Sequence, residues 1–110
     1  MKASKNKSYS IPQRKQFLLK SYQNIKADST DSLKARRLAS NAYHNLKLSD
    51  TILFKRRNAE AMALATTLKD SFAMGDVHWN YATFYVNKEI YDSAYHHFND
   101  AFSYFDKRGH

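Results

Sequence analysis

The chain of 110 residues has no cysteine, one proline and only two glycines. Without cysteine there are no disulfides and no thiolate metal sites, which agrees with a reducing compartment. No segment alternates apolar and polar residues for long enough to predict a strand. Glycine and proline, which interrupt helices, are nearly missing. The sequence therefore predicts one all-α domain.

Sequence motifs typical of enzymes, and apolar segments that could insert into a membrane, are missing as well. No apolar run approaches the roughly 18 residues that a membrane-spanning helix needs, and the basic start of the chain lacks the apolar stretch of a secretory signal. A cytoplasmic location is the resulting expectation. There is no glycine-rich phosphate loop and no nucleophile motif, so neither an enzymatic activity nor a cofactor is expected.

Capping residues and apolar spacing divide the chain into about five helices. Residues 1–10 are expected to be a basic, disordered N-terminus. Ser10 and Pro12 then begin a helix over residues 11–27. The capping side chains of residues 28–32 start a second helix, and Ser49 and Asp50 start a third that ends near Lys69. The second has an apolar stripe made by Ala35, Leu38, Ala39, Ala42, Tyr43 and Leu46.

Residues 75–108 show the clearest pattern, that of a helical hairpin. Apolar positions recur at steps of three and four residues in both halves. The first half has His78, Tyr81, Ala82 and Tyr85; the second has Tyr91, Ala94, Tyr95, Phe98, Ala101, Phe102 and Phe105. Between them, residues 87–89 leave room for only a tight connection, so the two faces should close as an antiparallel pair.

This hairpin resembles the tetratricopeptide repeat. The family's positions are matched by Asn80, Tyr81, Ala82, Tyr85, Tyr91, Asp92, Ala94, Phe98 and Ala101. Three positions depart from the pattern: His78 replaces a bulky residue, Glu89 the turn glycine and Asp106 the terminal proline. The resemblance implies an α-solenoid of antiparallel hairpins. An ordinary helical hairpin is the alternative.

Residues 30–69 resemble an earlier, degenerate copy of the repeat at residues 71–108. A shift of 40 residues aligns Ala42 with Ala82 and Ala61 with Ala101, but it also sets Asn58 against Phe98. The long helices are similar to the extended variant found in bacterial sensors and transcriptional regulators. Residues 11–27 would then be a capping helix within a single repeat domain over residues 11–110.

The resemblance also implies a concave groove that binds a peptide or a partner helix. Its expected lining is Arg36, Tyr43, Asp76, Trp79, Thr83, Val86 and Asn87. Trp79 is the expected anchor, because an indole offers a large rigid surface and one donor. The alternative is that Trp79 packs against the following helix.

A second candidate interface is the aromatic face of the last helix. Eleven of the sixteen aromatic residues lie between Phe72 and Phe105, and repeat units bury such faces against neighbours. This predicts either further repeats or self-association through Tyr95, Phe98, Phe102 and Phe105.

Charge is distributed unevenly. Residues 1–57 hold fourteen Lys or Arg against three Asp or Glu, whereas residues 58–110 hold four against seven. The basic half favours an acidic peptide, a polyanion, or the acidic half of a second copy as the partner.

Nucleic acid is the alternative partner. The basic residues that would contact it are Lys34, Arg36, Arg37, Lys55, Arg56 and Arg57, although no motif that reads bases accompanies them. Lipid binding by the first helix is a weaker alternative, since basic residues surround Phe17, Leu18 and Leu19.

The five histidines do not predict a metal site. None has a sequence spacing typical of metal ligands, and His96 with Asp100, one helical turn apart, is the nearest approach. The sequence thus predicts a binding module without metal or catalytic residues.

Overall fold

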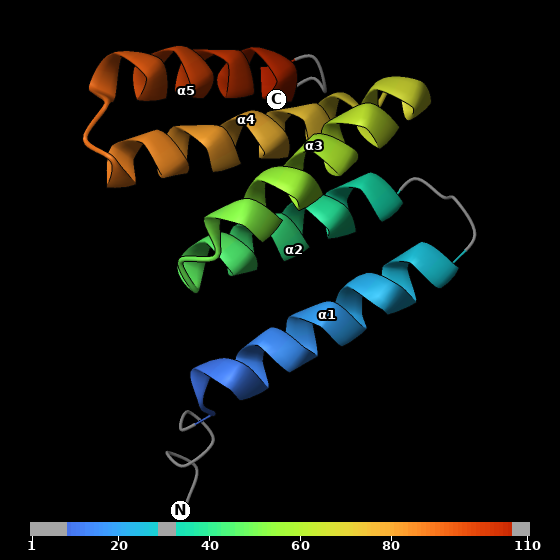
Figure 1. Cartoon of the computed structure of the whole chain (residues 1–110). Helices are drawn as coiled ribbons and strands as arrows, with labels where there is room; N and C mark the ends of the chain where they lie inside the picture. The colour runs from blue at the N-terminus through green and yellow to red at the C-terminus, as the bar shows by residue number, and fades with distance from the viewer. Residues whose placement is uncertain (1–8, 29–32, 107–110) are drawn as a thin grey trace, which may run out of the picture.

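The computed structural model describes residues 9–28 and 33–106, and in these ranges every regular element is a helix. The five helices are α1 (Ile11–Ala27), α2 (Lys34–Lys47), α3 (Thr51–Leu68), α4 (Ser71–Asn87) and α5 (Tyr91–Asp106) (Figure 1). The prediction of an all-α fold with about five helices is confirmed. The predicted disorder of residues 1–8, and capping by residues 29–32, lie outside the described ranges.

Most helices begin at the predicted caps. Ser10 and Gln13 form a reciprocal capping box at the start of α1. Asp50 caps α3 by accepting a hydrogen bond from the Leu53 amide, and Asp70 caps α4 in the same way. By contrast, α2 follows Leu33 with no side-chain cap, and Asp28 belongs to the end of α1.

The connections after α2, α3 and α4 share one geometry at intervals of 20 residues. Ser49, Lys69 and Glu89 each have a positive φ, between 54° and 63°. In each turn the next amide bonds back to the carbonyl five residues earlier, as in Ile90 N to Tyr85 O at 2.9 Å. Two such units make a 40-residue hairpin, in agreement with the sequence shift. Glu89 thus occupies a conformation that glycine adopts at lower cost.

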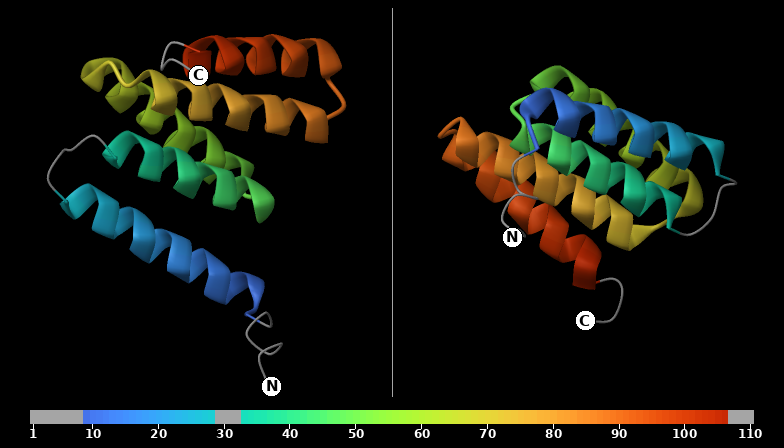
Figure 2. Two further views of the ribbon diagram at one scale, coloured as in Figure 1. Left: turned by 180° about the vertical axis from the view of Figure 1, so that it is seen from behind. Right: turned by 90° about the horizontal axis from the view of Figure 1, so that it is seen from below.

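The hairpins stack in chain order. α2 packs on α3 and α4 on α5, while α4 also contacts both helices of the first hairpin. α1 and α5 lie at opposite ends of the stack (Figures 1 and 2). Small side chains allow this close packing: Ala35, Ala42, Ala61, Ala82 and Ala101 are all fully buried.

α1 lies along α2, where a capping helix would lie. Its Ile25 is buried, and the Asn41 amide donates to the Leu18 carbonyl at 2.9 Å. Glu60 of α3 accepts a hydrogen bond from Tyr22 and pairs with Lys26. Burial alone would raise the pKa of Glu60, but the hydrogen bonds from Lys26 and Tyr22 outweigh burial and lower it.

Two features differ from the sequence analysis. Asn58, which the alignment set against Phe98, is fully buried and donates to the Val77 carbonyl at 3.1 Å, so it is a core residue. In α5 the expected apolar face is divided. Ala94 and Ala101 face α4, whereas Tyr91, Tyr95 and Phe102 are exposed, because a stripe that wide exceeds the area one neighbouring helix can cover.

Candidate partner-binding groove

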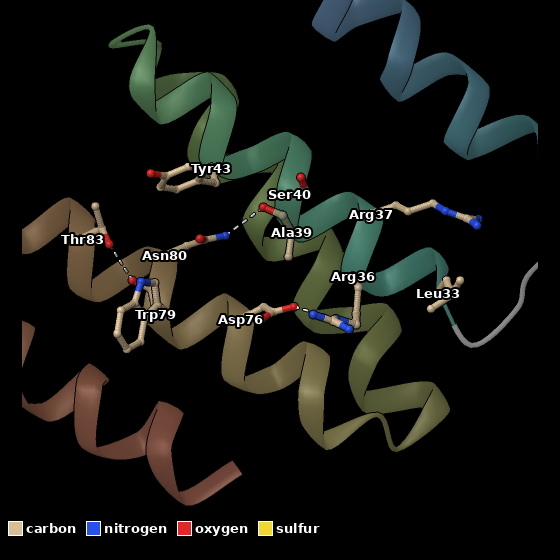
Figure 3. A pocket seen from close by; sticks show the side chains of 10 residues that line it. All are labelled: Leu33, Arg36, Arg37, Ala39, Ser40, Tyr43, Asp76, Trp79, Asn80 and Thr83. Atoms are coloured by element: carbon tan, nitrogen blue, oxygen red, sulfur yellow. Dashed lines mark hydrogen bonds and ion pairs between the residues drawn. The ribbon is translucent and has the colours of Figure 1, made fainter. Parts of the chain in front are cut away.

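α2 and α4 border an open groove of about 510 Å³ (Figure 3). Five of the seven residues expected there line it: Arg36, Tyr43, Asp76, Trp79 and Thr83. The other two, Val86 and Asn87, are exposed near the C-terminal end of α4 and are not part of its lining. The repeat pattern placed them one turn too far along the helix.

The sequence analysis missed the rest of the lining, which consists of Leu33, Arg37, Ala39, Ser40 and Asn80. Two signals were available. Positions 33, 36, 37, 40 and 43 share one helical face. The 40-residue shift also pairs positions on the two sides of the groove, because it matches Arg36 and Ser40 of α2 with Asp76 and Asn80 of α4. The groove is therefore formed by equivalent positions of two consecutive hairpins.

One ion pair crosses the groove. Arg36 Nε donates to Asp76 Oδ2 at 3.0 Å, and the guanidinium carbon lies 4.0 Å from the centre of the Phe72 ring. The terminal nitrogens of Arg36 have no hydrogen-bond partner among the described residues. Burial raises the pKa of Asp76, and the hydrogen bond from Arg36 opposes that rise without cancelling it. The pair thus holds Arg36 in a fixed position, with its outer fork available to another carboxylate.

The floor of the groove is rigid. The Asn80 side-chain amide donates to the Ala39 carbonyl and to Asn58 Oδ1, both at 2.9 Å. It is nearly buried, and it connects α4 to α2 and α3. The Ser40 and Tyr43 hydroxyls above this floor make no hydrogen bond to any described residue. They are available to a bound chain.

Trp79 separates the groove from the outer helix. Its ring is 41% exposed and meets the rings of Phe98 and Phe102 edge to face, at centroid distances of 4.8 and 5.9 Å. Trp79 thus lines the groove and also packs against α5, so the two positions that the sequence offered as alternatives for this side chain are both occupied.

The four residues of the expected self-association face do not form one exposed surface. Tyr95 and Phe102 are 65% and 53% exposed. Phe98 is half-buried against Trp79, and Phe105 packs on Phe72 with its ring over Gly75. The exposed α5 surface instead consists of Tyr91, Tyr95 and Phe102.

Three of the six basic residues considered for nucleic acid are held by contacts within the fold. Lys34 is buried and donates to the Asp28 carbonyl, and Arg36 is paired with Asp76. Arg57 lies 3.5 Å above the centre of the Tyr22 ring, toward α1. These three cations support the fold in three different places, so the helices offer no continuous basic surface through them.

No family model matches this chain, and neither the curated proteins nor the solved structures compared with it give a match. None of the described helices is long and apolar enough to cross a membrane.

Proposed function

We propose that the chain is a helical-repeat interaction module of the tetratricopeptide kind, without catalytic activity, whose α2–α4 groove binds an acidic peptide segment of a partner protein. The observation that carries the proposal is Arg36, a groove-lining residue that Asp76 and Phe72 hold in place and whose hydrogen bond to Asp76 uses only Nε. The 40-residue period and long helices also favour membership of a bacterial regulatory protein of the extended-helix kind.

The groove chemistry defines the peptide. An acidic side chain would accept two hydrogen bonds from Arg36. Further along, Tyr43 and Trp79 offer aromatic surface for an apolar side chain. The Ser40 and Tyr43 hydroxyls are positioned for the peptide backbone. We therefore expect an acidic residue followed by an apolar one within an extended segment.

Trp79 is the only tryptophan of the chain, so its fluorescence reports on the groove directly. Peptides selected from a library of acidic and neutral sequences would be titrated against the chain. We expect acidic peptides to change Trp79 emission, and the substitution Arg36→Gln to weaken their binding about tenfold or more. Filling the groove with Ser40→Phe should abolish the response.

Arg36→Gln alone leaves the Asp76 carboxylate without its partner, so a double variant is needed. Arg36→Gln with Asp76→Asn removes both charges, and it should fold like the wild type while still failing to bind acidic peptides. The matched control is Arg56→Gln, an exposed arginine outside the groove. If peptides bind these variants and Ser40→Phe as they bind the wild type, the groove is not the site.

We propose self-association as a second binding function, between α5 of one copy and α1 of the next. α5 exposes Tyr91, Tyr95 and Phe102, and its charged residues are all acidic: Asp92, Asp100 and Asp106. α1 exposes Ile11, Phe17 and Leu19, and its charged residues are all basic: Arg14, Lys15, Lys20 and Lys26. The two outermost helices thus carry opposite charge together with exposed apolar side chains, and this combination favours head-to-tail contact.

A further inference from the structure

The second hairpin brings three metal-ligating side chains together. His78 on α4 and His97 on α5 have their Nδ1 atoms 3.0 Å apart, and Asp100 Oδ2 lies 3.8 Å from His78 Nδ1. One ligand atom from each of the three residues falls within 4.8 Å of the others. His97 and Asp100 are three residues apart on one helical face, and the tight turn after α4 sets His78 opposite them.

Burial and close mutual approach both favour the neutral form of the two imidazoles. Burial lowers the pKa of His78 and of His97, and the Asp100 carboxylate only partly opposes this effect. Two imidazolium rings with nitrogens 3.0 Å apart would also repel each other strongly. A metal ion binds the neutral form of imidazole.

A stack of four rings fixes the orientation of the imidazoles. Tyr104 lies on His78 with an angle of 10° between the rings, and Tyr85 lies on His97 with an angle of 8°. His78 and His97 themselves stack at 29°. Such support around the ligands reduces the reorganisation that binding requires. Asp100, by contrast, is exposed, so its carboxylate can rotate toward an ion and water can reach the remaining positions.

We propose that His78, His97 and Asp100 form a binding site for a divalent transition metal ion, with Zn²⁺ as the preferred ion. Tetrahedral Zn²⁺ with bonds of about 2.0–2.1 Å needs donors roughly 3.3 Å apart. The separations of 3.0 and 3.8 Å lie on either side of that distance. Two imidazoles with one carboxylate favour Zn²⁺ over Ca²⁺ or Mg²⁺, which prefer oxygen ligands.

The ion would join α4 to α5 and so stabilise the second hairpin. It would replace the hydrogen bond between the two Nδ1 atoms, and the imidazole that donates this bond would then carry its proton on Nε2. No other described element contributes a ligand, so water would fill the fourth tetrahedral position. The sequence analysis did not find this site because His78 and His97 are 19 residues apart, and only the turn register places them together.

The test uses the untagged chain, stripped with a chelator and titrated with ZnCl₂ by calorimetry. We expect one Zn²⁺ per chain and a higher melting temperature with the ion than without it. His97→Phe keeps a ring in the stack but removes a ligand, and it should weaken binding at least tenfold. Asp100→Asn changes an exposed side chain without risk to the fold, and it should weaken binding less. MgCl₂ should give no response.

His96→Phe is the matched control, because His96 neighbours His97 but is exposed and outside the cluster. It should bind Zn²⁺ as the wild type does. Circular dichroism of each metal-free variant would show whether the fold is retained. Equal Zn²⁺ affinity of the wild type, His97→Phe and Asp100→Asn would overturn the site, as would a loss in His96→Phe equal to that in His97→Phe.

Discussion

At the scale of single residues, buried side-chain amides connect the helices. Asn58 and Asn80 hydrogen-bond to each other and to the carbonyls of Val77 and Ala39, across α2, α3 and α4. A second pair, Asn41 and Asn45, is also buried. Each of these hydrogen bonds has a fixed direction, so the amides specify how the helices are arranged in a core otherwise rich in alanine.

Replacing one partner of this network should destabilise the fold. In Asn80→Ala, the Ala39 carbonyl and Asn58 Oδ1 would lose a buried donor, which costs about 1–3 kcal/mol of unfolding free energy. Denaturant unfolding measures the change. Asn87→Ala at the exposed end of α4 is the control and should stay within about 0.5 kcal/mol of the wild type. Equal stability of the two variants would show that the buried amide contributes nothing.

At the scale of elements, the hairpin of α4 and α5 should be sensitive to acid. His78 and His97 have lowered pKa values in the folded chain, chiefly because they are buried. In the unfolded chain they would take up protons near pH 6.5. Their contribution to stability is therefore complete above about pH 6.5 and is lost as the pH falls toward the folded-state values. We expect a lower melting temperature at pH 5.5 than at pH 7.5, measured with a chelator present.

Other groups titrate over the same range, so the comparison needs a variant. Asp100 favours protonation of both histidines, and His96 opposes that of His97. His97→Phe removes the shared nitrogen contact while keeping a ring between Tyr85 and His78. Its melting temperature should change less between the two pH values than that of the wild type. An identical change in both proteins would assign the acid sensitivity to other residues.

The helices were the part of the structure that the sequence predicted best, because helix caps and apolar stripes depend on residues close together in the chain. Asp50 and Asp70 cap helices through hydrogen bonds from amides three residues away, and Ala82 lies on an apolar stripe and is buried. Pairings between elements were harder to predict. Arg36 meets Asp76 across 40 residues, and His78 meets His97 across 19. Both depend on the register in which helices stack, which no local pattern contains.

At the scale of the whole molecule, the uneven charge seen in the sequence becomes a polarity of the stack. The basic half includes α1 at one end, and the acidic half includes α5 at the other (Figure 2). A contact between unlike ends uses a different surface on each copy, so every complex keeps an unpaired α1 at one end and an unpaired α5 at the other, and it can continue into chains. A symmetric contact between two α5 surfaces would instead bring acidic residues together and stop at a dimer.

These two modes are separated by blocking one end at a time. Phe17→Lys would place a charge on the exposed α1 surface, and Phe102→Lys would do the same on α5. If the association is head-to-tail, the average mass of the wild type in analytical ultracentrifugation should increase with protein concentration. The increase should be smaller at 1 M salt, where charges are screened beyond about 3 Å.

Each variant alone should be monomeric. An equimolar mixture should form dimers, because one intact α1 surface and one intact α5 surface are then available. A dimer of Phe17→Lys by itself would indicate the symmetric contact, and a mixture that stays monomeric would exclude the head-to-tail contact.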